Sequence, residues 1–210
     1  MYNIEKQMNK YFVSGIGTGI GKTVASAILS QAMHAGYWKP IQSGDLDDTD
    51  SMKIANWTNG VKVFPERYRL EFPASPHQSS KMENITISVK DCIVPETDRT
   101  LFIEGAGGLM VPLNDTEMMI DLIKVLQTPV ILCSMYYLGA INHTLLSYEV
   151  LQKYNIPIAG IVFIGEENSD SKSFILKHTK IPVIAEVSFS EHINKDFILE
   201  QSKNVYVDLL

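Results

Sequence analysis

The sequence predicts an α/β fold, with a mostly parallel β-sheet flanked by helices on both faces. Short apolar runs rich in strand-forming residues alternate with helical patterns, and the connections between them are brief. The run 130–134 is apolar almost throughout, as strands covered on both faces are. Strand–helix alternation of this kind builds parallel sheets. No domain boundary interrupts the pattern, so we expect one domain over residues 1–210, with 1–9 as a flexible tail.

Each expected element rests on its own stretch of sequence. The helix at 140–154 carries Ile141, Leu145 and Leu151 on one face at helical spacing. Residues 59–96 contain four of the nine prolines, so we expect an irregular segment that folds over the active end of the sheet. The expected strands are 11–14, 38–41, 100–104, 130–134, 158–164, 182–186 and 205–207, and the other expected helices are 23–33 and 117–127.

Composition and charge exclude several kinds of partner. Hydrophobic residues make up 45% and charged residues 20% of the chain, ordinary values for a soluble globular protein. The formal net charge of −6 argues against a nucleic-acid partner, which selects for a basic face. The first ten residues lack the apolar core of a signal peptide, and no apolar run approaches the roughly 20 residues of a spanning helix. We therefore expect a cytoplasmic protein that binds neither nucleic acid nor membrane.

The strongest local signal is the glycine-rich segment Gly15-Ile-Gly-Thr-Gly-Ile-Gly-Lys-Thr23, between the first expected strand and the first helix. Glycines let successive backbone N–H groups face phosphate oxygens, and the helix N-terminus adds its positive end. We expect Lys22 to reach the β- and γ-phosphates and the Thr23 hydroxyl to bind Mg²⁺. This predicts a fold of the P-loop NTPase type, although Ile16 stands where the strict pattern has its first glycine. The expected nucleotide contacts in this loop are Gly19, Ile20, Gly21, Lys22, Thr23 and Val24.

Further polar residues follow two other expected strands. Glu104 ends a buried strand, the position where P-loop enzymes place a second anchor for Mg²⁺. The next residues, 105–108, are glycine-rich and leave backbone amides free to face a phosphate or an oxyanion. Lys39 follows another strand end, where it would offset the charge of a transferring phosphoryl group or an anionic substrate. The acidic stretch 45–50 is either simply solvated or supplies one more Mg²⁺ ligand, and its four aspartates do not say which one.

Two remaining motifs are candidates for holding a substrate. The first is Ala74-Ser-Pro-His77, and the second is Leu138-Gly-Ala-Ile-Asn-His143, which opens a helix. At such a helix start the Gly139 and Ala140 amides form an anion site suited to a carboxylate. On the residues alone, Asn142 is equally an ordinary helix-start residue.

Together these segments resemble the dethiobiotin synthetase family. The family pattern has five residues before Gly-Lys-Thr, which Gly15 to Thr23 fits and which accounts for the irregular spacing. The resemblance runs in order from Lys10 to Gly160, and the ordered combination is specific although each motif alone is modest. It also covers Lys39-Pro with Ser43-Gly44, Asp50, Ser75-Pro-His77, Glu104-Gly-Ala-Gly-Gly108 and Gly139-Ala-Ile-Asn-His143.

The resemblance implies that 7,8-diaminopelargonic acid, CO₂ and ATP are converted to dethiobiotin, ADP and phosphate in biotin synthesis. One amine captures CO₂ as a carbamate, and the carbamate attacks the γ-phosphoryl group to form a carbamic–phosphoric anhydride. The second amine then closes the ureido ring. The resemblance also implies a homodimer in which the helix start at 139–142 of the partner subunit grips the substrate carboxylate.

Roles for individual residues follow from the same resemblance. Lys22 and Lys39 are the expected catalytic residues, because they offset charge on the γ-phosphate and the carbamate. No side chain need act as a nucleophile, so positioning and electrostatics supply the catalysis. The implied Mg²⁺ ligands are Thr23, Asp50 and Glu104. The implied ATP contacts outside the loop are Asp50, Glu104, Gly105, Ala106, Gly107, Ile164 and Gly165, and the implied substrate contacts are Ser43, Gly108, Gly139, Ala140 and Asn142.

The chain departs from the family pattern at several positions. Gly19 stands where some relatives carry an acidic residue, Tyr137 stands where a basic residue can occur, and a proline expected near 187–189 is absent. At the end of the strand 158–164, Ile164 replaces the Asn that reads the adenine in relatives. We therefore expect looser base selectivity than in a strict ATP enzyme.

Two other functions remain as alternatives. A partitioning or site-selection ATPase shares the predicted fold, but such switches carry an additional Lys early in the loop, where this chain has Gly17. Their membrane-bound members end in a basic amphipathic helix, whereas residues 204–210 alternate as a strand does. A nucleotide-binding regulator without chemistry is the third reading, and no residue specifically supports it.

Overall fold

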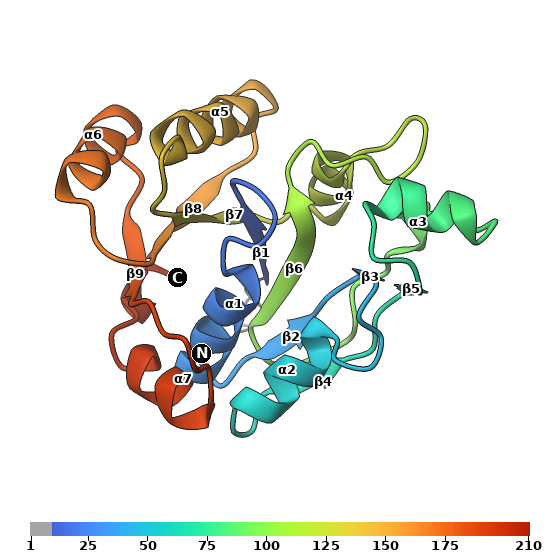
Figure 1. Ribbon diagram of the computed structural model, residues 1–210, viewed down its shortest axis with the longest axis horizontal. Coiled ribbons are helices and arrows are strands. Elements are labelled where there is room, and N and C mark those ends of the chain that lie inside the picture. Colours follow the sequence, from blue (N-terminus) through green and yellow to red (C-terminus); the bar gives the residue numbers. More distant parts are fainter. Residues whose placement is uncertain (1–9) are drawn as a thin grey trace, which may run out of the picture.

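The computed structural model describes residues 10–210, and the expected tail at 1–9 lies outside them. Seven parallel strands form one sheet in the order β4-β2-β6-β1-β7-β8-β9 (Figure 1). Two short strands, β3 (Ile41–Ser43) and β5 (Tyr68–Leu70), pair in a separate small sheet. The main strands are β1 (Lys10–Gly15), β2 (Gly36–Trp38), β4 (Lys62–Phe64), β6 (Leu101–Gly108), β7 (Val130–Met135), β8 (Ile158–Ile164) and β9 (Val183–Val187).

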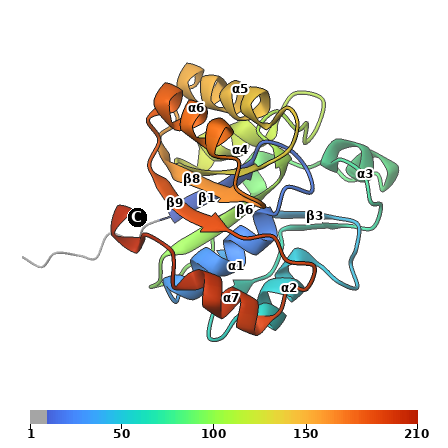
Figure 2. The same cartoon turned by 60° about the vertical axis from the view of Figure 1, so that its left-hand side comes forward.

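Helices cover both faces of the main sheet, as the sequence predicts. Figure 2 shows helices on both sides of the strands. One face carries α1 (Lys22–Ala32), α2 (Asp50–Trp57) and α7 (Lys195–Ser202), and the other carries α4 (Met119–Leu126), α5 (Ala140–Lys153) and α6 (Ser169–Thr179). The short helix α3 (Pro76–Met82) lies beside the small sheet, and two single turns complete the described chain, η1 (Val89–Asp91) and η2 (Val207–Leu209). The α/β fold of the P-loop type is therefore confirmed.

The period-two alternation of side chains divides the core between the two faces. Phe12 packs in the cluster under α4, whereas its neighbour Val13 packs in the cluster under α1. Both side chains are fully buried, because the parallel sheet is covered on each side. The same alternation later decides which side chains from β2 and β6 meet at the site.

Several expected elements are wrong in detail. The strand expected at 38–41 is two strands in different sheets, because proline at position 40 has no N–H to donate and the chain turns out of the main sheet there. Residues 59–96 are not irregular throughout, since they hold β4, β5, α3 and η1. The strand expected at 100–104 continues through the glycines to Gly108.

The end of the chain also differs from expectation. Residues 205–207 are not a strand: Tyr206 donates a single backbone hydrogen bond to Ile184, and the chain then forms the turn η2. The helices α2, α6 and α7 were not expected. No helix within residues 10–210 is long and apolar enough to cross a membrane.

Candidate active site

The phosphate loop leaves the carboxyl end of β1 and runs into α1. Gly19 and Gly21 have φ angles of 70° and 85°, in the left-handed region that favours glycine. A β-carbon on Gly15 would lie 2.6 Å from an Ile20 side-chain carbon, so the loop folds closely on itself. Its curled backbone and the start of α1 are the arrangement that the glycine spacing predicts.

Lys22 is buried and turned back over its own loop. Its Nζ donates a hydrogen bond of 2.8 Å to the Gly17 carbonyl oxygen. Burial lowers the pKa of Lys22, and the charge of nearby Lys39 adds to the lowering while Glu104 opposes it. The Lys22 ammonium therefore lies over the loop, and Lys22 lines the crevice into which the loop opens.

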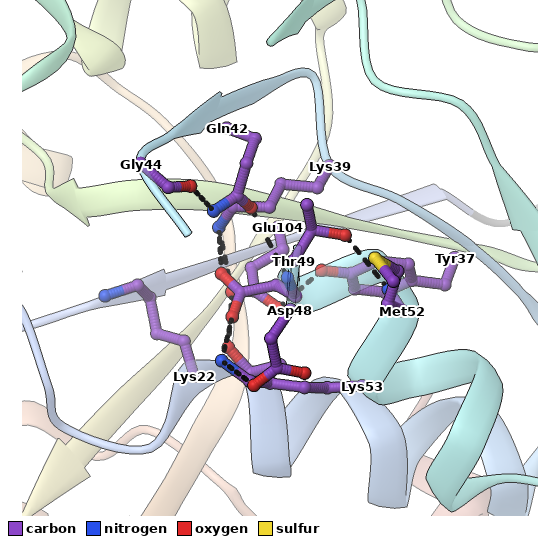
Figure 3. Close-up of polar contacts among 12 residues, drawn as sticks. Lys22, Tyr37, Lys39, Gln42, Gly44, Asp48, Thr49, Met52, Lys53 and Glu104 are labelled. Atoms are coloured by element: carbon purple, nitrogen blue, oxygen red, sulfur yellow. Dashed lines mark hydrogen bonds and ion pairs between the residues drawn. The ribbon is translucent and has the colours of Figure 1, made fainter. Parts of the chain in front are cut away.

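Glu104 is the centre of the polar network (Figure 3). Its side chain is only 1% exposed. One carboxylate oxygen, Oε1, accepts hydrogen bonds from Thr23 Oγ1 at 2.9 Å and from Lys39 Nζ at 3.1 Å. The other, Oε2, accepts one from the Tyr37 hydroxyl at 2.9 Å. Groups from α1, β2 and the residue after β2 thus converge on Glu104 in the middle of the central strand β6.

Lys39 joins Glu104 to Asp50. Its Nζ lies 2.8 Å from Asp50 Oδ2 and 3.1 Å from Glu104 Oε1. Burial alone lowers the pKa of Lys39, but the two carboxylates outweigh burial and hold that pKa above its usual value. Burial likewise raises the pKa of Asp50, and the Lys39 charge, with hydrogen bonds from Lys39 and Thr23, reverses this and holds the pKa below its usual value. Lys39 and Asp50 are therefore both charged at neutral pH.

The position of Asp50 follows from a helix start. Thr49 caps α2 by accepting a hydrogen bond of 3.1 Å from the Met52 amide, and Asp50 is the first residue of the helix. Buried Gln42 links this start to the preceding loop: its Oε1 accepts from the Asp50 amide, and its Nε2 donates to the Gly44 carbonyl at 2.9 Å. Within the acidic stretch 45–50, Asp50 is the aspartate that pairs with Lys39.

One open crevice of about 720 Å³ is lined by Lys22, Thr23, Lys39, Gln42, Asp50 and Glu104. Ser43, Ser75 and Pro76 form its outer wall. The buried Ser43 Oγ has no hydrogen-bond partner within residues 10–210. Of the expected site residues, the crevice brings together Gly19, Ile20, Gly21, Lys22, Thr23, Val24, Lys39, Ser43, Asp50, Glu104, Ala106 and Gly107.

The other expected site residues lie outside this crevice. Gly105 is buried against Phe12, and Gly108 lines a separate apolar cavity between the phosphate loop and α5. Ile164 packs over Gly21, and Gly165 lines a further cavity at the ends of β8 and β9. Gly139 caps α5, and Ala140 and Asn142 lie in its first turn, none of them lining the crevice.

Sequence reasoning missed two residues of the network. Tyr37 reads as one more core aromatic, and the available signal is its spacing of two residues from Lys39, which is the period of side chains on one face of an extended chain. Gln42 follows the expected strand 38–41, and no sequence pattern predicts its hydrogen bonds with Asp50 and Gly44.

Comparisons with known proteins agree with this geometry. A family model described as "AAA domain" matches residues 9–196. The chain is 45% identical over 194 residues to the ATP-dependent dethiobiotin synthetase BioD of Cytophaga hutchinsonii, covering 91% of this chain and 94% of that protein. It is 41% identical over 206 residues to the protein of the same name from Agrobacterium fabrum, covering 91% and 97%.

Solved structures of other proteins resemble this chain in fold alone. A ParA family ATPase from Chlorobium tepidum superposes with a TM-score of 0.59 at 11% identity, covering 93% of this chain and 98% of that one. The cell-division ATPase MinD of Pyrococcus furiosus gives a TM-score of 0.56 at 16% identity, covering 94% and 98%. At such low identity these partitioning and division ATPases share only the architecture, whereas the two relatives named above match in sequence along nearly the whole chain. The chain belongs to the dethiobiotin synthetase family.

Proposed function

We propose that this protein uses ATP to convert 7,8-diaminopelargonic acid and CO₂ to dethiobiotin, with release of ADP and phosphate. The observation that carries the proposal is the meeting of Lys22, Lys39, Asp50 and Glu104 at the mouth of a phosphate loop. A reaction that joins two anions, a carbamate and the γ-phosphate of ATP, needs fixed cations at the point where they meet. The ATP-dependent synthetases named above, similar along nearly the whole chain, support the same reaction.

The steps balance without a covalent bond to the protein. One amine of the substrate adds to CO₂ and loses a proton, forming a carbamate. A carbamate oxygen then attacks the γ-phosphorus, and the bond to ADP breaks. The second amine attacks the carbonyl carbon of this mixed anhydride, phosphate leaves, and the ring closes with loss of a proton. Lys22 and Lys39 hold and neutralise the anions through these steps, so catalysis comes from orientation and charge.

The side chains of Thr23, Asp50 and Glu104 suit Mg²⁺. Their donors are one hydroxyl and two carboxylates, the hard oxygen ligands that Mg²⁺ takes. Within residues 10–210, no group of three or more His, Cys, Asp and Glu side chains is gathered into a metal cage. A few protein oxygens completed by water and nucleotide phosphates are the usual Mg²⁺ arrangement. Mg²⁺ held there would neutralise charge on the β- and γ-phosphates.

The substrate side of the site is assigned to the outer wall of the crevice. The unpartnered Ser43 hydroxyl would orient the carbamate there. Gly108 lines the neighbouring cavity beside the phosphate loop, so its backbone amide would reach the carbamate only from that side. The helix start at Gly139, Ala140 and Asn142 would bind the substrate carboxylate. Because those three residues lie outside the crevice of their own chain, we assign that contact to the partner subunit of a homodimer.

The surface near this helix start supports the dimer. Leu138 is fully exposed, and Tyr137, Leu146 and Met110 are also exposed apolar side chains. Sedimentation should show a dimer for the wild type and a monomer for Leu138→Asp. Leu199→Asp on α7, where the leucine is likewise exposed, is the control and should remain dimeric. A dimeric Leu138→Asp protein would rule out this surface as the interface.

Incorporation of labelled bicarbonate tests the reaction itself. We expect acid-stable label only when ATP and 7,8-diaminopelargonic acid are both present, in a protein that works in the cytoplasm where ATP is available. If ATP turns over while no acid-stable label forms, the proposed reaction is wrong. Turnover independent of the diamine would instead favour an ATPase switch.

A further inference from the structure

We propose that Tyr37 is a positioning residue that sets the orientation of the Glu104 carboxylate toward the phosphate crevice. The inference rests on the proposed function, in which Glu104 is a Mg²⁺ ligand. Tyr37 is fully buried on β2, and its hydroxyl donates to Glu104 Oε2 at 2.9 Å (Figure 3). It does not line the crevice, so we expect its influence on the reaction to act through Glu104.

Strand register brings the two side chains together. Tyr37 pairs with Phe102 across β2 and β6, and Glu104 lies two residues beyond Phe102 on the same face. A long aromatic side chain reaches this diagonal neighbour on an adjacent strand. The hydrogen bond is therefore set by the pairing of two central strands and not by a mobile loop.

The two oxygens of Glu104 have different tasks. Oε1 faces the crevice, where Thr23 Oγ1 and Lys39 Nζ donate to it. Oε2 faces the core, and within residues 10–210 Tyr37 is the donor that satisfies it. The terminal torsion of a Glu side chain is broad, so packing alone does not fix the plane of the carboxylate. The Tyr37 hydroxyl does so and leaves Oε1 for the ligands of the crevice.

The tyrosine ring serves packing separately from its hydroxyl. The ring belongs to the apolar cluster that includes Phe102, Ala25 and Ile28 under α1. The hydroxyl is the polar part of the side chain, and its contact is the hydrogen bond that it donates to Glu104 Oε2. Tyr37→Phe thus removes the donor while it keeps the ring that fills the core.

The test measures metal affinity directly. Mn²⁺ binding to the enzyme with a non-hydrolysable ATP analogue is followed by electron paramagnetic resonance, and product formation is titrated with Mg²⁺. For Tyr37→Phe we expect both metal dependences to weaken by about 10-fold or more, as for other residues that orient metal ligands. We expect the KM for 7,8-diaminopelargonic acid to stay close to that of the wild type.

Tyr11→Phe is the matched control. Tyr11 is also buried, on strand β1 at the other side of β6, and its ring stacks on Phe102 at a centroid distance of 5.7 Å. Its hydroxyl donates to the Leu210 carbonyl and not to the site. Loss of this hydroxyl should leave Mn²⁺ affinity unchanged. A weakening equal to that of Tyr37→Phe would mean that the core, and not the Glu104 contact, controls the metal.

Two results would overturn the inference. One is a Tyr37→Phe protein with wild-type Mn²⁺ affinity, whether or not its melting temperature falls. The other uses 3-fluorotyrosine at position 37, which keeps the hydroxyl and the ring. If the ¹⁹F chemical shift of this residue does not change when Mg²⁺ is added at saturating nucleotide analogue, the hydroxyl is not coupled to the metal. Neither measurement needs turnover, so a wild type that makes no dethiobiotin would refute the proposed function and leave this test standing.

Discussion

Ile164 packs its side chain directly over the α-carbon of Gly21, the last glycine of the phosphate loop. A β-carbon built on Gly21 would lie 3.1 Å from both Cδ1 and Cγ2 of Ile164. Ile164 is 8% exposed and ends β8, at the place where the family pattern has an adenine-reading Asn. The carboxyl end of β8 therefore meets the loop through an aliphatic contact that has no hydrogen-bond donor or acceptor in its side chain.

Weak selection of the nucleotide base is the first prediction. A site without a hydrogen bond to the base rejects wrong ligands by only about 100-fold, so GTP or CTP should support at least about 1% of the rate with ATP. Ile164→Asn should make the preference for ATP steeper, whereas Ile164→Val, which stays apolar, should not. Initial rates with ATP, GTP and CTP test this prediction. Wild-type rates with GTP and CTP below about 1% of the rate with ATP would contradict it.

Replacing Lys39 should cost both stability and activity. Lys39→Met leaves Asp50 and Glu104 without their buried cation, and breaking such a pair costs about 3–5 kcal/mol in the free energy of unfolding. Dethiobiotin formation should fall by at least about 100-fold, since a fixed charge at the reacting groups is lost. Urea unfolding and bicarbonate incorporation measure the two effects.

Lys124→Met is the control for this variant. Lys124 lies 3.1 Å from Asp121, the same distance as Lys39 from Glu104, but on the surface of α4. Exposed pairs contribute less than about 1 kcal/mol, so the control should unfold and react nearly as the wild type does. Full activity in Lys39→Met would overturn the role assigned to Lys39.

Acid should remove the contribution of Asp50 to stability. Its pKa is lower in the folded protein than the usual value of 3.8, so the carboxylate stabilises the fold above that value and stops doing so as the pH falls through the lower, folded pKa. The melting temperature of Asp50→Asn should lie below that of the wild type near neutrality. The two curves should converge in this acid range, and a gap that does not change with pH would contradict the assignment.

Gly44 should be far less replaceable than a glycine with the same backbone angle elsewhere. Its φ is 71°, and a β-carbon there would lie 2.5 Å from the Pro73 α-carbon. Gly60 has a φ of 73° with nothing within 4 Å of such a carbon. Alanine at either position costs about 1–2 kcal/mol of backbone strain. Only Gly44→Ala should also raise the KM for 7,8-diaminopelargonic acid, because the new methyl group pushes the backbone next to Ser43 away from Pro73. Equal KM values in the two variants would contradict this prediction.

The sequence predicts the fold best where a pattern has one physical cause. Full burial makes β7 and β8 almost wholly apolar, and both were expected nearly where they lie. The helices α6 and α7 were missed because each buries only two residues, Ile175 with Thr179 and Ile198 with Ser202, which leaves little periodicity. Their capping residues, Asn168 and Asn194, were the signal available, since each side chain accepts a hydrogen bond from the first turn.

In the site, too, some residues could be predicted from the sequence and others could not. Lys39 and Glu104 were predictable because parallel strands deliver their carboxyl ends to one edge, and the structure joins them at 3.1 Å. The hydrogen bond of the Tyr37 hydroxyl was not predictable. It depends on which strands pair and in which register, and a single sequence does not reveal either. The substrate contacts at 139–142 remain predictions, since they involve a second copy of the chain.

Prolines stand where the chain leaves the main sheet at β2 and at β4. Pro40 follows Lys39, Pro65 follows β4, and the Trp38 indole donates to the Pro65 carbonyl at 3.0 Å, tying the two departures together. Beyond them lie the small sheet and the segments that carry Ser43 and Ser75. The strands of these two segments pair with each other and with no strand of the main sheet. Protein engineers therefore have two natural points, at Pro40 and Pro65, from which to graft a pocket for a different diamine, provided that Asp50 keeps its place on α2.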